Sequence, residues 1–175
     1  MPHPLLTTTA RLAIPLLAAA AIVIPAVGTP APGLPIDTGT PDVRATLSRP
    51  LELPGAVPGD VVTSALTITS GGITTRTSVT LTATDPDGKH LGEALLVHAT
   101  PVDHPDHCTT ELAITNPTRG IPTDGISVLD DLRIDRDQSA TVCIRVELPR
   151  TAGNQYQAAT TSLDVITSHT QEIPA

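Results

Sequence analysis

The sequence predicts an all-β fold in which two sheets pack as a jelly-roll or immunoglobulin-like sandwich, and three observations carry this prediction. Apolar and polar residues alternate with a period of two in several short segments, the pattern of strands with one buried face. Threonine is abundant, whereas the helix-favouring residues Lys, Glu and Gln are few. Eighteen prolines and twelve glycines divide the chain into short pieces, which suits a sandwich and argues against a helical bundle.

The composition limits both the core and the partners of the chain. A single Tyr is the only aromatic residue, so the core must be aliphatic. The formal net charge is −8, and it becomes −9 without the leader described next, because nine basic side chains then oppose eighteen acidic ones. The basic residues form no cluster, so nucleic acid is not an expected partner. The acids are scattered, which points to solubility and not to a recognition surface.

Residues 1–28 have the organisation of a secretory signal peptide. Arg11 ends a short n-region, an uncharged apolar run follows over residues 12–27, and small residues precede the expected cleavage site after Gly28. The run is short for a spanning helix, and its retention as a membrane anchor is the alternative. We therefore expect a secreted or cell-surface protein that has no membrane contact after cleavage.

Beyond the leader, three parts are predicted: a flexible Pro-, Gly- and Thr-rich arm at residues 29–42, a sandwich domain at 43–170 and a tail at 171–175. The domain begins with alternating apolar residues at 43–53, which Pro50 interrupts. Because proline cannot donate a ladder hydrogen bond, this interruption indicates an edge strand or a break between two short strands.

Strand patterns continue through the middle of the domain. Residues 61–69 and 79–83 lie on either side of a Ser-Gly-Gly turn and are predicted to pair as a hairpin. An Asp-Pro-Asp-Gly turn follows at residues 85–88, and its few oxygens cannot fill a calcium coordination shell. Further short strands are predicted at residues 95–99, 112–114 and 126–134, the last of them at a sheet edge.

A strand, a polar elbow and a second strand close the domain. Residues 141–148 alternate between apolar and polar, Pro149 stops the strand, and residues 151–154 supply turn chemistry. Tyr156 is predicted to open the last strand, in which the alternation resumes at residues 163–165. We expect Tyr156 to be a packing anchor, with its ring over the end of the core and its hydroxyl reaching backbone polar groups.

The most chemically reactive tract holds His98, Asp103, His104, Asp106, His107 and Cys108. Imidazole and thiolate groups at such spacing are raw material for a zinc or copper site, and His104, His107 and Cys108 are the weak metal candidates. Two prolines make the tract a stiff loop, however, and its spacings match no standard zinc module. We therefore predict a solvated loop and no bound cofactor or metal.

The two cysteines, Cys108 and Cys143, are predicted to form a disulfide, because a pair of cysteines in an exported chain usually does. Cys108 precedes a predicted strand, and Cys143 lies on the polar face of another. The alternative makes Cys108 a metal ligand beside the two histidines.

Three short motifs give a resemblance to a known family. Residues 148–157, with the alternation that follows them, and residues 53–60, with their proline-glycine-acid turn, resemble signatures of the TasA/camelysin family of secreted bacterial surface and biofilm-matrix proteins. Residues 132–140 resemble a third, but they lack its proline and glycine. The resemblance implies a fibre or matrix subunit that self-associates by donating an N-terminal strand, with other matrix proteins as further partners.

Camelysin-type members of that family are described as metal-dependent endopeptidases, so the resemblance also implies an enzymatic alternative. The chain has no His-Glu-x-x-His motif for zinc proteolysis, no Gly-x-Ser-x-Gly elbow and no phosphate-binding glycine loop. We expect a non-enzymatic structural protein, with the endopeptidase and a free-standing secreted binding module as the alternatives.

Overall fold

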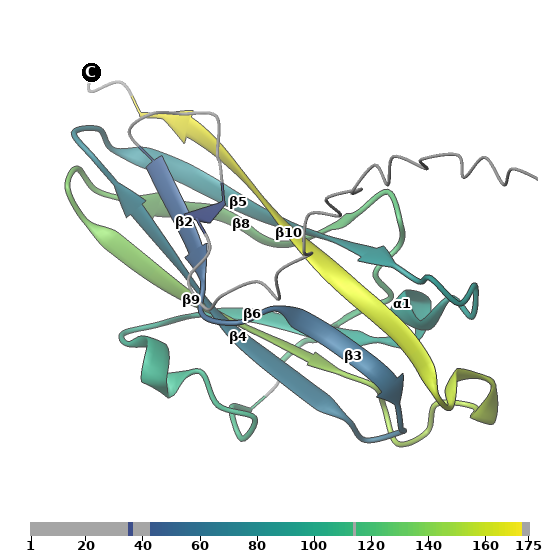
Figure 1. Cartoon of the computed structure of the whole chain (residues 1–175). Coiled ribbons are helices and arrows are strands. Elements are labelled where there is room, and N and C mark those ends of the chain that lie inside the picture. The colour runs from purple at the N-terminus through teal and green to yellow at the C-terminus, as the bar shows by residue number, and fades with distance from the viewer. Residues whose placement is uncertain (1–34, 37–42, 114, 173–175) are drawn as a thin grey trace, which may run out of the picture.

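The computed structural model describes residues 35–36, 43–113 and 115–172, which form a β-sandwich (Figure 1). The predicted signal peptide at 1–28 lies outside the described residues, as do the arm at 29–42, apart from residues 35–36, and the last three residues of the tail. Among the described residues, no helix is long and apolar enough to cross a membrane.

Over these described ranges, ten strands make up the two sheets, and all of their pairs are antiparallel. Sheet A has six strands in the order β1-β2-β4-β9-β6-β7, and sheet B has four in the order β3-β10-β5-β8. The strands of sheet A are β1 (Pro35–Ile36), β2 (Val43–Leu47), β4 (Val61–Ser70), β9 (Ser139–Glu147), β6 (Leu96–Val102) and β7 (Thr118–Arg119). Those of sheet B are β3 (Leu51–Ala56), β10 (Ala159–Gln171), β5 (Thr75–Thr84) and β8 (Ile126–Ile134). Three short helices lie in the connections: α1 (Leu91–Ala94), η1 (Pro105–His107) and η2 (Asn154–Tyr156).

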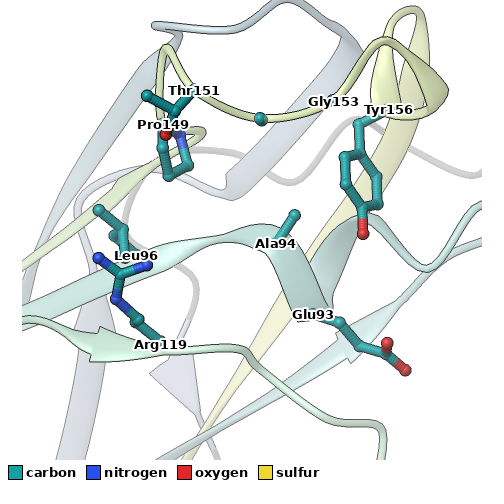
Figure 2. Close-up of a pocket in the computed structure, with 9 residues that line it drawn as sticks. Glu93, Ala94, Leu96, Arg119, Pro149, Thr151, Gly153 and Tyr156 are labelled. Atoms are coloured by element: carbon teal, nitrogen blue, oxygen red, sulfur yellow. The ribbon is translucent and has the colours of Figure 1, made fainter.

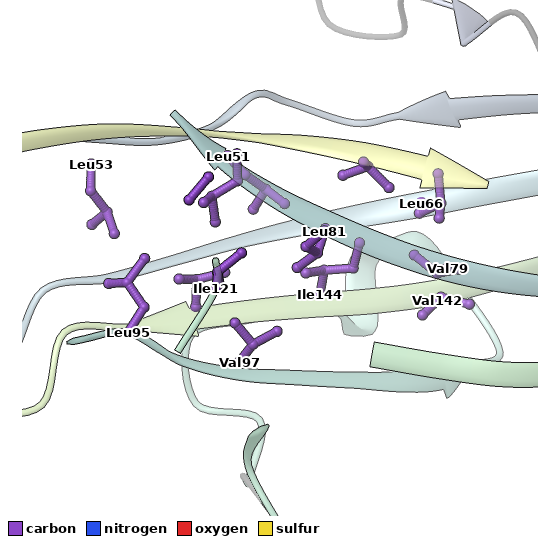
Figure 3. Close-up of a cluster of buried hydrophobic side chains, with 14 of the residues drawn as sticks. Leu51, Leu53, Leu66, Val79, Leu81, Leu95, Val97, Ile121, Val142 and Ile144 are labelled. Atoms are coloured by element: carbon purple, nitrogen blue, oxygen red, sulfur yellow. The ribbon is translucent and has the colours of Figure 1, made fainter. Parts of the chain in front are cut away.

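The core between the sheets is aliphatic, as predicted. Alternate residues of the central strands face it, so that Leu66 of β4 opposes Val79 and Leu81 of β5 across the sandwich (Figure 3). The largest fully buried side chains are Leu51, Leu66, Ile68, Leu81, Leu91, Leu95, Ile121, Ile144 and Leu148. Burying one such side chain contributes about 1.5–3 kcal/mol to the stability of the fold. The core is therefore stabilised by many aliphatic side chains in place of the usual aromatic ones.

Most connections between consecutive strands cross from one sheet to the other. The predicted hairpin of β4 and β5 is therefore wrong: β4 pairs with β2 and β9, whereas β5 pairs with β10 and β8. Residues 71–74 between them are long enough to span the distance of about 10 Å that separates packed sheets. Two strands with alternating apolar and polar residues and a short turn between them have the same sequence pattern in both cases. They can pair in one sheet, or they can lie in opposite sheets.

Pro50 marks one of these crossings. It lies between β2, which ends at Leu47 in sheet A, and β3, which begins at Leu51 in sheet B, so the predicted break between two short strands is confirmed. Arg49, beside it, donates from its guanidinium group to the carbonyl and hydroxyl oxygens of Thr63, on the part of β4 that β2 does not cover.

Three other predictions meet different outcomes. β8 is an edge strand of sheet B, as expected. The strand predicted at 112–114 is absent where the chain is described, because Leu112 lies in a bend, and Ile114 lies outside the described residues. Tyr156 does not open the last strand: it ends η2, and β10 begins three residues later at Ala159.

Gly92 in α1 leaves no room for a side chain. Its N–H lies 3.2 Å from both carboxylate oxygens of Asp85, and its carbonyl accepts hydrogen bonds from the backbone of Leu95 and Ile121. A Cβ at this position would lie 2.5 Å from the Cβ of Ala83 and 2.7 Å from the carbonyl oxygen of Ile121. Only glycine therefore lets α1 sit directly on sheet B.

We predict that Gly92→Ala lowers the free energy of unfolding by about 1–3 kcal/mol, the usual cost of overpacking a filled site. Urea denaturation followed by circular dichroism measures this loss. The exposed neighbour Glu93→Ala is the control and should change stability by about 0.5 kcal/mol or less. Equal midpoints for Gly92→Ala and wild type would show that the close approach is not rigid.

Candidate functional site

The described residues form a pocket at one end of the sandwich, between the elbow that follows β9 and the segment from α1 into β6. Its volume is about 290 Å³. Pro149 and Thr151 of the elbow lie on one side, and Ala94 and Leu96 lie on the other (Figure 2). Arg119 lies at the same end as Leu96, whereas Tyr156 and Glu93 lie at the opposite end (Figure 2).

Backbone hydrogen bonds hold the elbow in place. Leu148 accepts a bond of 2.7 Å from Gly59 and donates one of 2.9 Å to Asp60, which ties the start of the elbow to the turn before β4. Within the elbow, Ala152 donates to Pro149 at 2.8 Å and Tyr156 donates to Gly153 at 3.1 Å. The elbow side of the pocket is therefore preformed.

The facing side of the pocket is fixed by the short strand β7. Leu96 of β6 pairs with Arg119 of β7, and Gly120 donates a hydrogen bond of 2.9 Å to the carbonyl of Leu95. Gly120 has a φ of 75°, a left-handed conformation that glycine adopts without strain. This geometry brings Arg119 beside the pocket from a loop that showed no functional pattern in the sequence.

Tyr156 is half-buried and packs against the core cluster. Its hydroxyl points toward α1 (Figure 2). The expectation that this hydroxyl reaches backbone polar groups is not met among the described residues, where it has no hydrogen-bond partner. The chain has a single Tyr and no Phe or Trp. The ring of this Tyr lines the pocket, and its hydroxyl is an unused donor.

The pocket carries several free hydrogen-bond donors. Within the described ranges, the Arg119 guanidinium and the Thr151 hydroxyl have no partner, and the N–H groups of Thr151 and Gly153 donate no hydrogen bond. Glu93, the acidic residue at the pocket, lies 3.7 Å from Nδ1 of His90 on the exposed side of α1. Sequence reasoning identified the elbow and Tyr156 but missed Arg119 and Glu93.

The histidine tract lies elsewhere, on and after β6. His98 belongs to β6, whereas His104 precedes η1 and accepts a hydrogen bond of 3.3 Å from the backbone N–H of Asp106. The rings of His104 and His107 are 6.1 Å apart between centroids. In the part of the chain that the structure describes, no group of three or more His, Cys, Asp or Glu side chains is arranged to hold a metal ion.

The predicted disulfide is confirmed. Cys108 and Cys143 are bonded, with their Cα atoms 5.1 Å apart, so Cys108 is not a thiolate and the alternative of Cys108 as a metal ligand is wrong. Cys143 lies on the outer face of sheet A, which was predicted to be the polar face. At this position the face is not exposed to solvent, because Cys143 is fully buried. The segment around η1 packs against β4 and β9, and the disulfide fastens it there.

The acidic turn at residues 85–88 has a structural role. The Asp85 carboxylate accepts from Gly92, and the Asp87 carboxylate accepts from the backbone N–H groups of Lys89 at 3.0 Å and Thr160 at 2.8 Å. These backbone hydrogen bonds hold the pKa of Asp87 below its ordinary value. Both carboxylates thus join the turn to neighbouring elements.

Two histidines are partly buried on strands. Burial, together with the positive charge of Arg145, lowers the pKa of His98, and burial lowers the pKa of His169. His169 contacts the hydroxyl of Thr77 at 2.8 Å and that of Thr167 at 3.1 Å. Thr77 is fully buried, so this pair of hydroxyl and imidazole is closed to a substrate and does not form a nucleophilic site.

Comparisons with known proteins do not place the chain in a family. No family model and no curated protein matches it. Among solved structures, a family 123 glycoside hydrolase from Clostridium perfringens, described for glycolipid glycan hydrolysis, matches at 14% identity and a TM-score of 0.31. The match covers 69% of this chain and 22% of the hydrolase. A TM-score of this size carries no argument about function.

We predict that replacing both cysteines, as Cys108→Ala with Cys143→Ala, lowers the free energy of unfolding by about 3–4 kcal/mol. The disulfide closes a loop of 35 residues and so lowers the conformational entropy of the unfolded chain. Without it, the unfolded chain has more entropy and the folded state is less stable. Thermal unfolding of the variant and of wild type, with and without reductant, measures the effect. Reductant should lower the Tm of wild type alone, and equal Tm values for both proteins in oxidant would contradict the prediction.

We also predict that acid destabilises the protein through His98 and His169. Their pKa values are lowered in the folded state, so below pH 6.5 the unfolded chain binds protons first. Their contribution is fully present above that pH and is lost as the pH falls toward the folded pKa values. The variant His98→Gln with His169→Gln should therefore lose less stability than wild type between pH 7.5 and 5, measured by urea midpoints. The exposed His90→Gln is the control, and parallel pH profiles for all three proteins would contradict the assignment.

Proposed function

We propose that this protein is an exported, non-catalytic structural subunit of the cell surface or extracellular matrix, and that it self-associates by exchanging its N-terminal strands. The observation that carries the proposal is the position of β1 and β2. They form one border of sheet A, where β2, among the described strands, pairs only with β1 and β4, and the crossing at residues 48–50 is their covalent connection to β3.

Export is supported by the buried disulfide. A disulfide of this kind persists in oxidising compartments outside the cytoplasm, which agrees with the signal-peptide pattern of residues 1–28.

Strand exchange is supported by the way this segment contributes to the core. Val43 and Ala45 of β2 are buried in sheet A, and Leu51 and Leu53 of β3 are buried in sheet B. The two strands are independent units joined by a short proline-containing crossing, so β2 can occupy the same place in a neighbouring molecule without disturbing β3. Such an exchange conserves every contact and, when it is head-to-tail, builds a filament.

Simple addition of strands at the sheet edges is disfavoured. Pro54 interrupts the border strand β3, and β7 is only two residues long. The edge strand β8 carries Asp130 and Asp131 at its centre, and Asp131 has a φ of 59° where the register with β5 shifts. Prolines, charges and bulges on edges prevent pairing between molecules, which leaves replacement of an existing strand as the route to assembly.

The resemblance to the TasA/camelysin family supports the same proposal, since its TasA-type members are matrix fibre subunits that associate by strand donation. The endopeptidase alternative requires a bound metal ion, and no metal-binding group of side chains occurs within the described ranges. Peptide hydrolysis that a chelator abolishes would favour that alternative.

We predict that mature protein carrying Thr46→Cys and Thr67→Cys forms covalent multimers. These residues face each other across β2 and β4, so oxidation links them within one chain when β2 is in its own fold and between chains when it is exchanged. Concentrated protein should be oxidised, analysed by non-reducing electrophoresis and imaged by electron microscopy. A ladder of multimers together with fibres is the expected result.

The matched control is Thr82→Cys with Asp164→Cys, which face each other across β5 and β10 in sheet B, away from the exchanged segment. Its crosslink should stay within one chain at every concentration. Purely intramolecular links at Thr46 and Thr67, with no fibres in the images, would refute the exchange and leave a free-standing module.

A further inference from the structure

We propose that the pocket at the elbow binds the carboxyl-terminal end of a peptide whose last side chains are small and apolar. This site is separate from the proposed assembly segment, because β1 and β2 lie on the other border of sheet A from β7. The inference rests on the free hydrogen-bonding groups of the pocket, on their placement and on the size of the cavity.

The groups at the pocket call for an acceptor-rich ligand. The Arg119 guanidinium, the Tyr156 and Thr151 hydroxyls and two backbone N–H groups of the elbow can all donate, and none has a partner among the described residues. Glu93 also lines the pocket, but its side chain lies at the opposite end from Arg119 (Figure 2), and its carboxylate is 3.7 Å from Nδ1 of His90. A carboxylate matches such a site, because a guanidinium and N–H groups bind it with short, charge-assisted hydrogen bonds.

The placement of the donors distinguishes a peptide end from a simple carboxylate. Arg119 and Tyr156 lie at opposite ends of the pocket, with Ala94 between them (Figure 2). A ligand that uses both therefore needs a carboxylate at one end, a second acceptor such as an amide carbonyl at the other, and an apolar part between. The terminal residues of a peptide provide this order of groups.

The walls and the volume limit the side chains of the ligand. Ala94, Leu96, Pro149 and Ala152 line the cavity with small apolar surfaces, and its volume of about 290 Å³ is at the lower end for small-molecule sites. Alanine-sized side chains fit such a space better than large ones. The protein is acidic overall, so attraction of an anion depends on the local charge of Arg119.

Titration of the ¹⁵N-labelled mature protein with N-acetyl-Ala-Ala, followed by NMR, tests the proposal. The peptide should shift the resonances of residues 94–96, 119–120 and 151–157. The amide-capped peptide N-acetyl-Ala-Ala-NH2 has the same shape without the charge and should bind at least tenfold more weakly. Propionate, which has the carboxylate but no second acceptor, should also bind at least tenfold more weakly.

Two variants assign the binding to the proposed donors. Arg119→Gln should weaken N-acetyl-Ala-Ala at least tenfold, whereas Tyr156→Phe, which keeps the ring and its packing, should weaken it about threefold or more. Arg44→Gln removes the same charge from an exposed site on β2 and should leave the affinity unchanged. Equal binding of the free and amide-capped peptides, equal binding of propionate, or equal losses for Arg119→Gln and Arg44→Gln would overturn the proposal.

Discussion

The fold depends on one constraint: most consecutive strands lie in opposite sheets, so the aliphatic core is what joins them. β2 passes to β3, β4 to β5 and β9 to β10 across the sandwich, and the long strands β4, β5, β9 and β10 pair with partners that are not their neighbours in sequence. Neither sheet can therefore form alone from local hairpins. Non-local pairing of this kind makes folding slow, because the entropy of loop closure is lost before the stabilising contacts form. The disulfide joins the η1 segment to the middle of sheet A. Because it closes one loop in the unfolded chain already, it reduces the entropy that is lost on folding.

The crossings also explain where many of the acidic residues are used. Asp60 accepts from the backbone of Val57 at 2.7 Å, and Asp137 accepts from that of Gly72 at 2.8 Å. Asp85 and Asp87 do the same for the turn between β5 and α1. Carboxylates hold these turns by accepting backbone N–H groups that no strand satisfies. Several acids that appear scattered in the sequence are thus structural, and the negative charge of the protein partly follows from its crossings.

The sequence predicted what depends on local pattern and missed what depends on pairing. The alternation of residues 141–148 identified β9, and Pro50 identified the break between β2 and β3, because side-chain period and proline chemistry act within a few residues. The pairing of β4 with β9 is set by the whole sandwich and could not be predicted from the turn at 70–72. At the pocket, turn chemistry marked the elbow, but Arg119 comes from a two-residue strand whose position depends on Gly92 and Leu95. Such convergence of distant segments leaves no local signal.

The position of Tyr156 separates the stability of the fold from the chemistry at its end. In most proteins of this size an aromatic ring would fill the core, yet here every fully buried large side chain is aliphatic among the residues described. The Tyr156 ring instead lies half-buried beside a cavity, and its hydroxyl is unpaired. In this position the ring buries less apolar area than it would in the core. The elbow that carries it is anchored by the backbone of Leu148, and α1 on the facing side is anchored through Gly92. The pocket is therefore held by backbone hydrogen bonds, so its side chains are free to be selected for binding.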